Sequence, residues 1–73
     1  MHTVYIHIDE NLDHERLHSL GDNIRGIEHI TDVEVNDKAP HDLLVEFEEQ
    51  HITPMAIIEA LNKQGIHADI MSG

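Results

Sequence analysis

The sequence predicts a small α+β domain in which two helices cover one face of a four-stranded antiparallel sheet. Three observations lead to this fold class. Four segments alternate apolar and polar residues, two others carry apolar residues every three or four positions, and the two kinds follow one another as strand, helix, strand, strand, helix, strand. With 73 residues and 40% hydrophobic content, the chain has material for one core, so we expect a single domain over residues 1–73.

The first half of the chain supplies a strand, a helix and a second strand. Apolar residues alternate from Thr3 to Asp9, which predicts a strand with one buried face. Asn11 or Asp13 can cap the helix that follows, whose apolar stripe comprises Leu17, Leu20, Ile24 and Ile27. Gly21 lies inside this helix, where it marks either a close approach to the sheet or a weak point. Alternation resumes at residues 30–36 and predicts the next strand.

The second half begins with a polar turn at residues 36–42 and a third strand whose buried face is Leu43, Val45 and Phe47. Thr53 and Pro54 are a favoured hydroxyl cap and first residue of a helix, and Gly65 is a typical helix stop. The buried stripe of this helix is Ile57, Ile58 and Leu61, and the last strand alternates Ile66, Ala68 and Ile70 with polar residues.

The resulting order is βαββαβ. Crossovers between parallel strands are right-handed, so both helices should cover the same face of a sheet with strand order 4-1-3-2. This is the ferredoxin-like sandwich.

Charge and composition exclude several classes of function. The formal charge of −11, with Lys+Arg at 4, opposes binding to nucleic acid and to anionic lipid. The chain has no cysteine, so it offers no disulfide and no thiolate for catalysis or metal binding. Met1 leads into His-Thr-Val-Tyr rather than a basic segment and a long apolar run, so we expect a soluble cytoplasmic protein without membrane insertion.

Two stretches resemble the heavy-metal-associated (HMA) domain, the module of copper chaperones and of metal-pumping P-type ATPases. Residues 24–27 (IRGI) lead into residues 30–35 (ITDVEV) as the family's first helix leads into its second strand. Residues 53–65 (TPMAIIEALNKQG) are similar to its second helix and closing glycine. The resemblance covers nearly the whole chain and implies the ferredoxin-like fold and an ancestry in metal handling.

The family's metal-binding motif, Met-Thr-Cys-x-x-Cys after the first strand, is missing. The resemblance places its two cysteines at about Asp13 and Arg16, or at Leu12 and Glu15 if the turn differs by one residue. Neither pair supplies sulfur, so thiolate binding of Cu(I) is not implied for this chain.

The eight histidines offer other ligands for a metal ion. Strand alternation places His7, His67, Glu46 and Asp69 on the uncovered face of the sheet, where imidazole and carboxylate could hold Zn(II), Ni(II), Co(II) or Cu(II). The competing interpretation is an ordinary solvated outer face, which is favoured while the strand register is unknown.

A second candidate site is His14 and His18, four residues apart on the first helix, with Asp13 at the helix start. Solvated histidines are ordinary on a helix flank, and Asp13 is expected to act as a cap. Between the two candidates, the sheet face is favoured because Arg16 and the positive end of the helix oppose a cation.

We find no nucleophile with a base, no glycine-rich phosphate loop and no paired carboxylates in a cleft, so no enzymatic activity is predicted. The leading hypothesis is an HMA-like domain that handles a divalent metal ion by weak His and carboxylate binding or by docking to a metal transporter or another protein with a basic surface. The alternative is a metal-free interaction module or an ACT-like regulatory module. Either a monomer or a weak homodimer is compatible with the sequence.

Overall fold

The computed structural model describes residues 2–72 and has the predicted order of elements. They are β1 (His2–Ile8), α1 (His14–Arg25), β2 (Ile30–Val35), β3 (Asp42–Phe47), α2 (Pro54–Lys63) and β4 (Ala68–Ser72). The predicted single domain over 1–73 also includes residues 1 and 73, which lie outside the described residues. Neither helix in the described part of the chain has the length and apolar character needed to cross a membrane.

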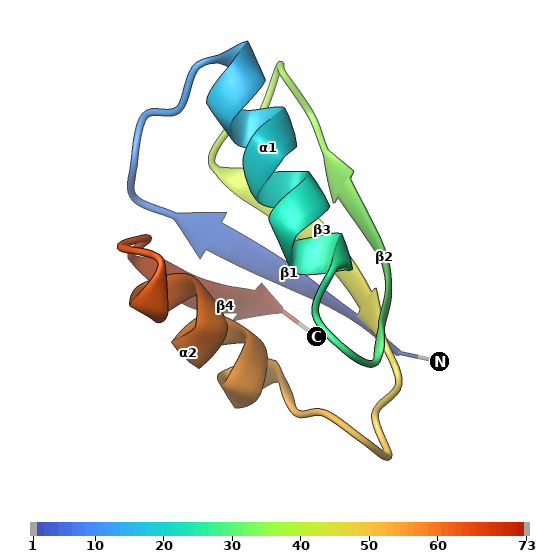
Figure 1. The fold of residues 1–73 in the computed structure, drawn as a ribbon. Coiled ribbons are helices and arrows are strands. Elements are labelled where there is room, and N and C mark those ends of the chain that lie inside the picture. The colour runs from blue at the N-terminus through green and yellow to red at the C-terminus, as the bar shows by residue number, and fades with distance from the viewer. Residues whose placement is uncertain (1, 73) are drawn as a thin grey trace.

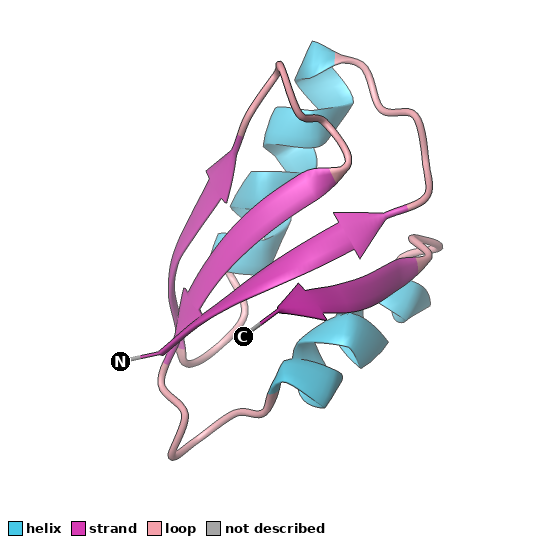
Figure 2. Ribbon diagram, turned by 180° about the vertical axis from the view of Figure 1, so that it is seen from behind, coloured by secondary structure: helices cyan, strands magenta, loops and turns pink. Residues whose placement is uncertain are grey.

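The four strands form one antiparallel sheet in the order β2-β3-β1-β4, which is the predicted order 4-1-3-2 read from the other edge. Figure 1 shows α1 and α2 both in front of the sheet, and the reverse view in Figure 2 shows the opposite face uncovered by any helix. The ferredoxin-like prediction is therefore confirmed.

The core lies between the helices and the covered face of the sheet. Its fully buried members come from five of the six elements and form one contiguous cluster: Val4, Ile6, Ile8, Leu17, Ile24, Val33, Leu43, Val45, Phe47, Ile57 and Leu61. Residues of both helix stripes and of the buried faces of β1 and β3 belong to this one cluster. Because β1 and β3 bury alternate residues, the other set of their side chains projects from the uncovered face.

The helix boundaries follow from local chemistry. Asp13 caps α1, since its carboxylate accepts a hydrogen bond from the backbone N–H of Arg16 at 2.9 Å. Thr53 caps α2 in the same way through the N–H of Ala56 at 3.2 Å, and Gly65 ends it with a φ of 84°.

Gly21 is a close approach between α1 and the sheet. A Cβ atom added at this position would lie 3.1 Å from the Cγ1 atom of Val35, at the end of β2. Of the two explanations that the sequence left open, the structure therefore supports close packing.

One prediction about β4 is wrong in detail. The strand begins at Ala68, not Ile66, and Ile70 remains 41% exposed although it pairs with the buried Ile6. β4 is an edge strand with a register shift against β1 between Tyr5 and Ile6, and this end of the strand is incompletely covered.

Candidate functional site

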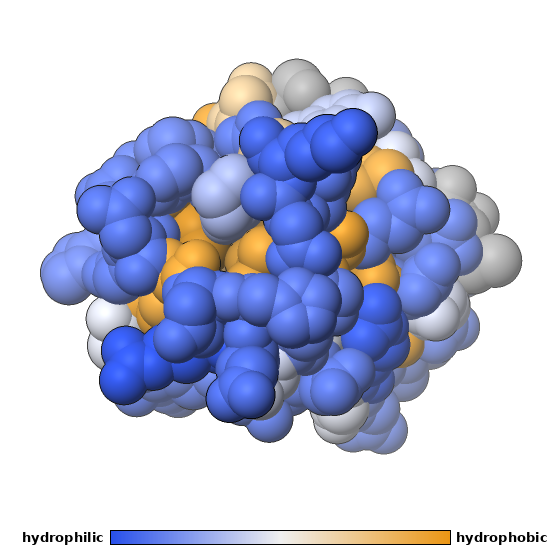
Figure 3. All heavy atoms as spheres, turned by 90° about the horizontal axis from the view of Figure 1, so that it is seen from above, coloured by the Kyte–Doolittle hydropathy of each residue, from blue (hydrophilic) through white to orange (hydrophobic). Residues whose placement is uncertain are grey.

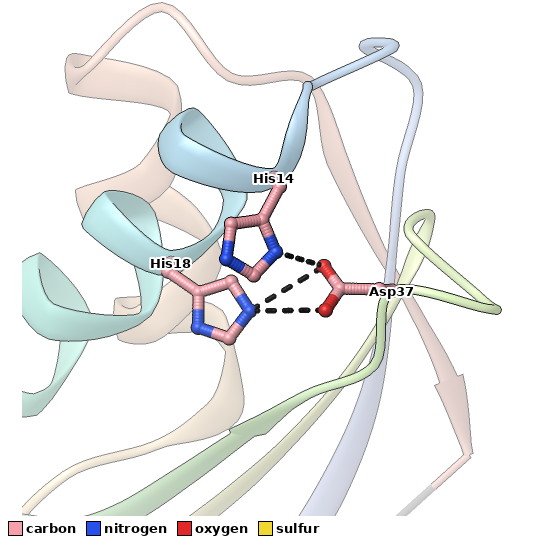
Figure 4. A group of neighbouring side chains, drawn as sticks. All are labelled: His14, His18 and Asp37. Carbon is pink, nitrogen blue, oxygen red and sulfur yellow. Dashed lines mark hydrogen bonds and ion pairs between the residues drawn. The ribbon is translucent and has the colours of Figure 1, made fainter.

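The candidate metal site consists of His14, His18 and Asp37, whose ligand atoms all lie within 4.8 Å of one another. The His14 Nδ1 atom lies 2.9 Å from Asp37 Oδ1, and the His18 Nε2 atom lies 3.4 Å from each carboxylate oxygen of Asp37. Both imidazoles point toward the same carboxylate in Figure 4, and their ring centroids are 4.3 Å apart. Two nitrogens and a carboxylate thus converge from segments that are far apart in the sequence.

The fold brings these segments together. β1 and β2 both run antiparallel to β3, so the connections that follow them lie at the same end of the sheet. The first turn of α1 and the β2–β3 connection accordingly meet at the top of Figure 1. His14 and His18 are one helical turn apart and share a face.

A tight turn positions Asp37 opposite this face. The backbone N–H of Ala39 donates to the carbonyl of Asn36 at 2.9 Å, and the N–H of Lys38 donates to the Asn36 side chain at 2.9 Å. Asp37 is therefore held by its neighbours in the turn and not only by the histidines.

The three side chains are accessible to solvent, with exposed fractions between 46% and 69%. Figure 3 views the surface from this end of the molecule and shows hydrophilic residues over most of it, with apolar groups in the recesses between them and at the edge of the view. An ion bound here would exchange with solvent or with a second molecule, because nothing encloses it.

The histidines keep Asp37 ionised. The hydrogen bond from His14 lowers the pKa of the Asp37 carboxyl below its ordinary value, and the hydrogen bond from His18 and the charges of both rings act in the same direction. The carboxylate is therefore available as an anionic ligand at neutral pH.

Arg16 does not face this site, although the sequence predicted that it would oppose a cation there. Residues two apart on a helix project to nearly opposite sides, so Arg16 lies away from the face that His14 and His18 share. It lines a separate cavity of about 390 Å³ together with Leu12 and Ser19.

Asp13, which the sequence grouped with His14 and His18, is occupied by its role as the cap of α1. Asp37 supplies the carboxylate instead. The sequence did not single out Asp37, although the expected topology places the connection after the second strand beside the start of the first helix.

The four residues predicted on the uncovered sheet face do not form one group. His7 and Asp69 are directly paired across β1 and β4, but Glu46 is paired with Thr3, four positions along β1 from His7. Because a strand rises by about 3.3 Å per residue, four positions along β1 separate Glu46 from His7 by about 13 Å. Glu46 instead accepts a hydrogen bond from the hydroxyl of Thr31 at 3.0 Å.

His67 precedes β4 and is engaged with Glu10 in the β1–α1 connection. Its Nδ1 atom lies 2.6 Å from Glu10 Oε2, and its backbone N–H donates to Glu10 Oε1 at 2.9 Å. The hydrogen bond from His67 lowers the pKa of Glu10, and the hydrogen bond to Glu10 raises the pKa of His67. This pair links two connections of the fold.

A second cluster, which the sequence did not predict, comprises His29, Glu48 and His51 at the other end of the sheet. His29 lies in the α1–β2 connection, and the other two lie in the β3–α2 connection. The antiparallel pairing of β2 and β3 brings the start of one strand beside the end of the other.

Comparison with known proteins finds no matching family model and no matching curated protein. Solved structures do match. A copper-binding domain from HMA7, a P-type ATPase, has a TM-score of 0.88 at 14% identity, over 99% of this chain and 96% of that chain. Oxidised MerP from Ralstonia metallidurans CH34 has a TM-score of 0.85 at 14% identity, over 97% of each chain.

The apo form of the copper chaperone of Enterococcus hirae has a TM-score of 0.81 at 18% identity, over 93% of this chain and 98% of that chain. The chain therefore has the fold of HMA domains, along essentially its whole length.

Proposed function

We propose that this domain is a metal-handling module that binds a divalent transition-metal ion, of the class of Zn(II), Ni(II), Co(II) or Cu(II), through His14, His18 and Asp37. The observation that carries the proposal is the convergence of two imidazoles and an ionised carboxylate from α1 and the β2–β3 connection. Imidazole and carboxylate are suitable ligands for these ions.

The open geometry favours transfer of the ion over permanent storage. Three protein ligands leave at least one coordination position for water or for a ligand of another molecule. The ligands are exposed, so a partner can approach the ion directly.

The position of the site agrees with the HMA resemblance. The resemblance placed the family's two cysteines at about Asp13 and Arg16, next to His14 in the chain. In this proposal the metal-binding end of the fold is kept while the ligands are changed from soft thiolates to imidazole and carboxylate. Cu(I) should therefore bind far more weakly than to a Cys-x-x-Cys domain.

The negative charge of the chain favours a partner protein with a basic surface. A formal charge of −11 attracts both cations and proteins with a positive surface, such as a domain of a metal transporter. The positive end of α1 acts against a cation at His14, but the Asp37 carboxylate offsets it within contact distance.

Calorimetric titration with Zn(II) at neutral pH tests the proposal. Asp37→Asn keeps the size of the side chain but removes its charge, and the double variant His14→Gln and His18→Gln removes both imidazoles. Each should weaken Zn(II) binding at this site by about tenfold or more. The control is His7→Gln with His67→Gln, which changes two histidines on the predicted sheet face.

If the control weakened binding and the first two variants did not, the sheet face would be the site. If the parent protein bound no divalent ion, the metal-free interaction or regulatory module would be the better account.

A further inference from the structure

The second cluster lies at the end of the sheet opposite to the His14 site. The His29 Nδ1 atom is 3.3 Å from Glu48 Oε1, and the rings of His29 and His51 stack with centroids 4.4 Å apart and an interplanar angle of 15°. One ligand atom from each of the three residues lies within 4.8 Å of the others. The cluster therefore repeats the donor set of two imidazoles and one carboxylate on different elements.

Backbone hydrogen bonds fix the segments that carry these side chains. The carbonyl of His29 accepts from the N–H of Glu48 at 2.9 Å, and the carbonyl of Glu48 accepts from the N–H of His51 at 3.0 Å. His29 also has a φ of 73°, in the left-handed region that few residues other than glycine adopt. The three positions are thus held relative to one another independently of any ion.

His29 and Glu48 are less exposed than the ligands of the His14 site. The His29 side chain is 33% exposed and the Glu48 side chain 45%, and the stacked ring of His51 limits the freedom of His29 further. Side chains that are already ordered lose less conformational entropy when they bind a ligand.

The local charge favours a cation. Glu28 Oε1 lies 3.9 Å from the Nε2 atom of His29, and Glu49 follows Glu48 and pairs with His2 at 3.2 Å. Residues 26–37 and 39–62 contain no lysine or arginine. Carboxylates therefore surround the cluster without a basic residue from either segment that builds it.

We propose that His29, Glu48 and His51 form a second, independent binding site for a divalent ion of the Zn(II) class. Metal–ligand bonds of about 2.0 to 2.2 Å require ligand atoms about 3.4 Å apart in a tetrahedral site. The His29–Glu48 distance of 3.3 Å already meets this requirement, and a ligand atom of His51 lies within 4.8 Å of both. The fourth position is open to water.

The test is calorimetric titration with Zn(II) in a chain that carries Asp37→Asn, which weakens the first site so that the second site can be followed separately. Adding Glu48→Gln should weaken the remaining binding by about tenfold or more, because a charged ligand is lost. Glu49→Gln is the matched control, since it removes the same charge from the neighbouring position outside the cluster. It should change the affinity by less than about twofold.

The proposal is overturned if Glu48→Gln leaves the affinity unchanged. It is also overturned if Glu49→Gln weakens binding equally, because the effect would then be general electrostatics.

A second pair of variants separates ligand loss from damage to the fold. His29→Asn keeps a residue that tolerates positive φ, and His51→Gln changes an exposed side chain. Both should abolish the visible absorption of bound Co(II) in the Asp37→Asn chain while the thermal midpoint of the apo protein stays within a few degrees. Unchanged Co(II) spectra would refute the site.

The two proposals fail separately. If only the His29 proposal is wrong, the parent chain binds one ion, and Asp37→Asn weakens the affinity for that ion.

Discussion

Truncation of Ile24 to alanine tests the packing of α1 on the sheet most directly. Ile24 is 0% exposed and lies on the helix stripe that faces the core. The substitution removes three buried carbon groups, a transfer free energy of about 2.4 kcal/mol, and the cavity left behind raises the cost to about 3 to 4 kcal/mol. The whole free energy of unfolding of a domain of this size is about 4 to 11 kcal/mol.

Urea unfolding followed by circular dichroism measures this loss as a lower midpoint with an unchanged slope. The same substitution at Ile70, which is 41% exposed, is the control and should cost no more than about half as much. A loss at Ile24 below about 1 kcal/mol, or equal losses at both positions, would refute the assignment of the buried face.

Three further perturbations test the local arguments. The added methyl group of Gly21→Ala meets Val35, so the effect of Gly21→Ala on the free energy of unfolding should be more favourable in a Val35→Ala chain than in the parent, by at least about 0.5 kcal/mol. Additive effects of the two substitutions in urea unfolding would contradict this contact. Thr53→Ala should lower the free energy of unfolding by about 1 kcal/mol through loss of the α2 cap, and no change in the urea midpoint would show that the cap contributes nothing.

Glu10→Gln should lower stability chiefly between about pH 4.5 and 6.5, measured as the difference in thermal midpoint from the parent. The raised pKa of His67 gives stability that is lost as pH rises through it, and the lowered pKa of Glu10 gives stability that is lost as pH falls through it. A difference that is constant from pH 4 to 8 would show that the ion pair is not responsible.

The fold was predictable because each element carries its own signal. The alternation at Val4, Ile6 and Ile8 predicts a strand with one buried face from the local sequence alone. Asp13 and Thr53 cap their helices through hydrogen bonds to residues three positions further on. The exposure of Ile70 was not predictable because it depends on the edge position and register shift of β4, which no local pattern encodes.

The site was harder to predict because its residues meet across the fold. His14 and His18 were recognisable from helical spacing, but Asp37 joins them only through the conformation of a turn 19 residues beyond His18. His7 and Glu46 share a sheet face, yet the register that separates them is fixed by pairing along the whole of β1 and β3. His29 depends on a positive φ, which favours glycine and which no local sequence pattern indicates.

The central claim is that His14, His18 and Asp37 bind a divalent ion, and the most direct test is NMR of the histidine side-chain nitrogens during a Zn(II) titration at neutral pH. Direct coordination shifts the bound nitrogen strongly and fixes the tautomer of the ring. Our account predicts such shifts at His14 and His18, and their loss below about pH 6 as protons compete with the metal. Ring nitrogens of His14 and His18 that remained unshifted at saturating Zn(II), with or without shifts at His7 and His67, would contradict it.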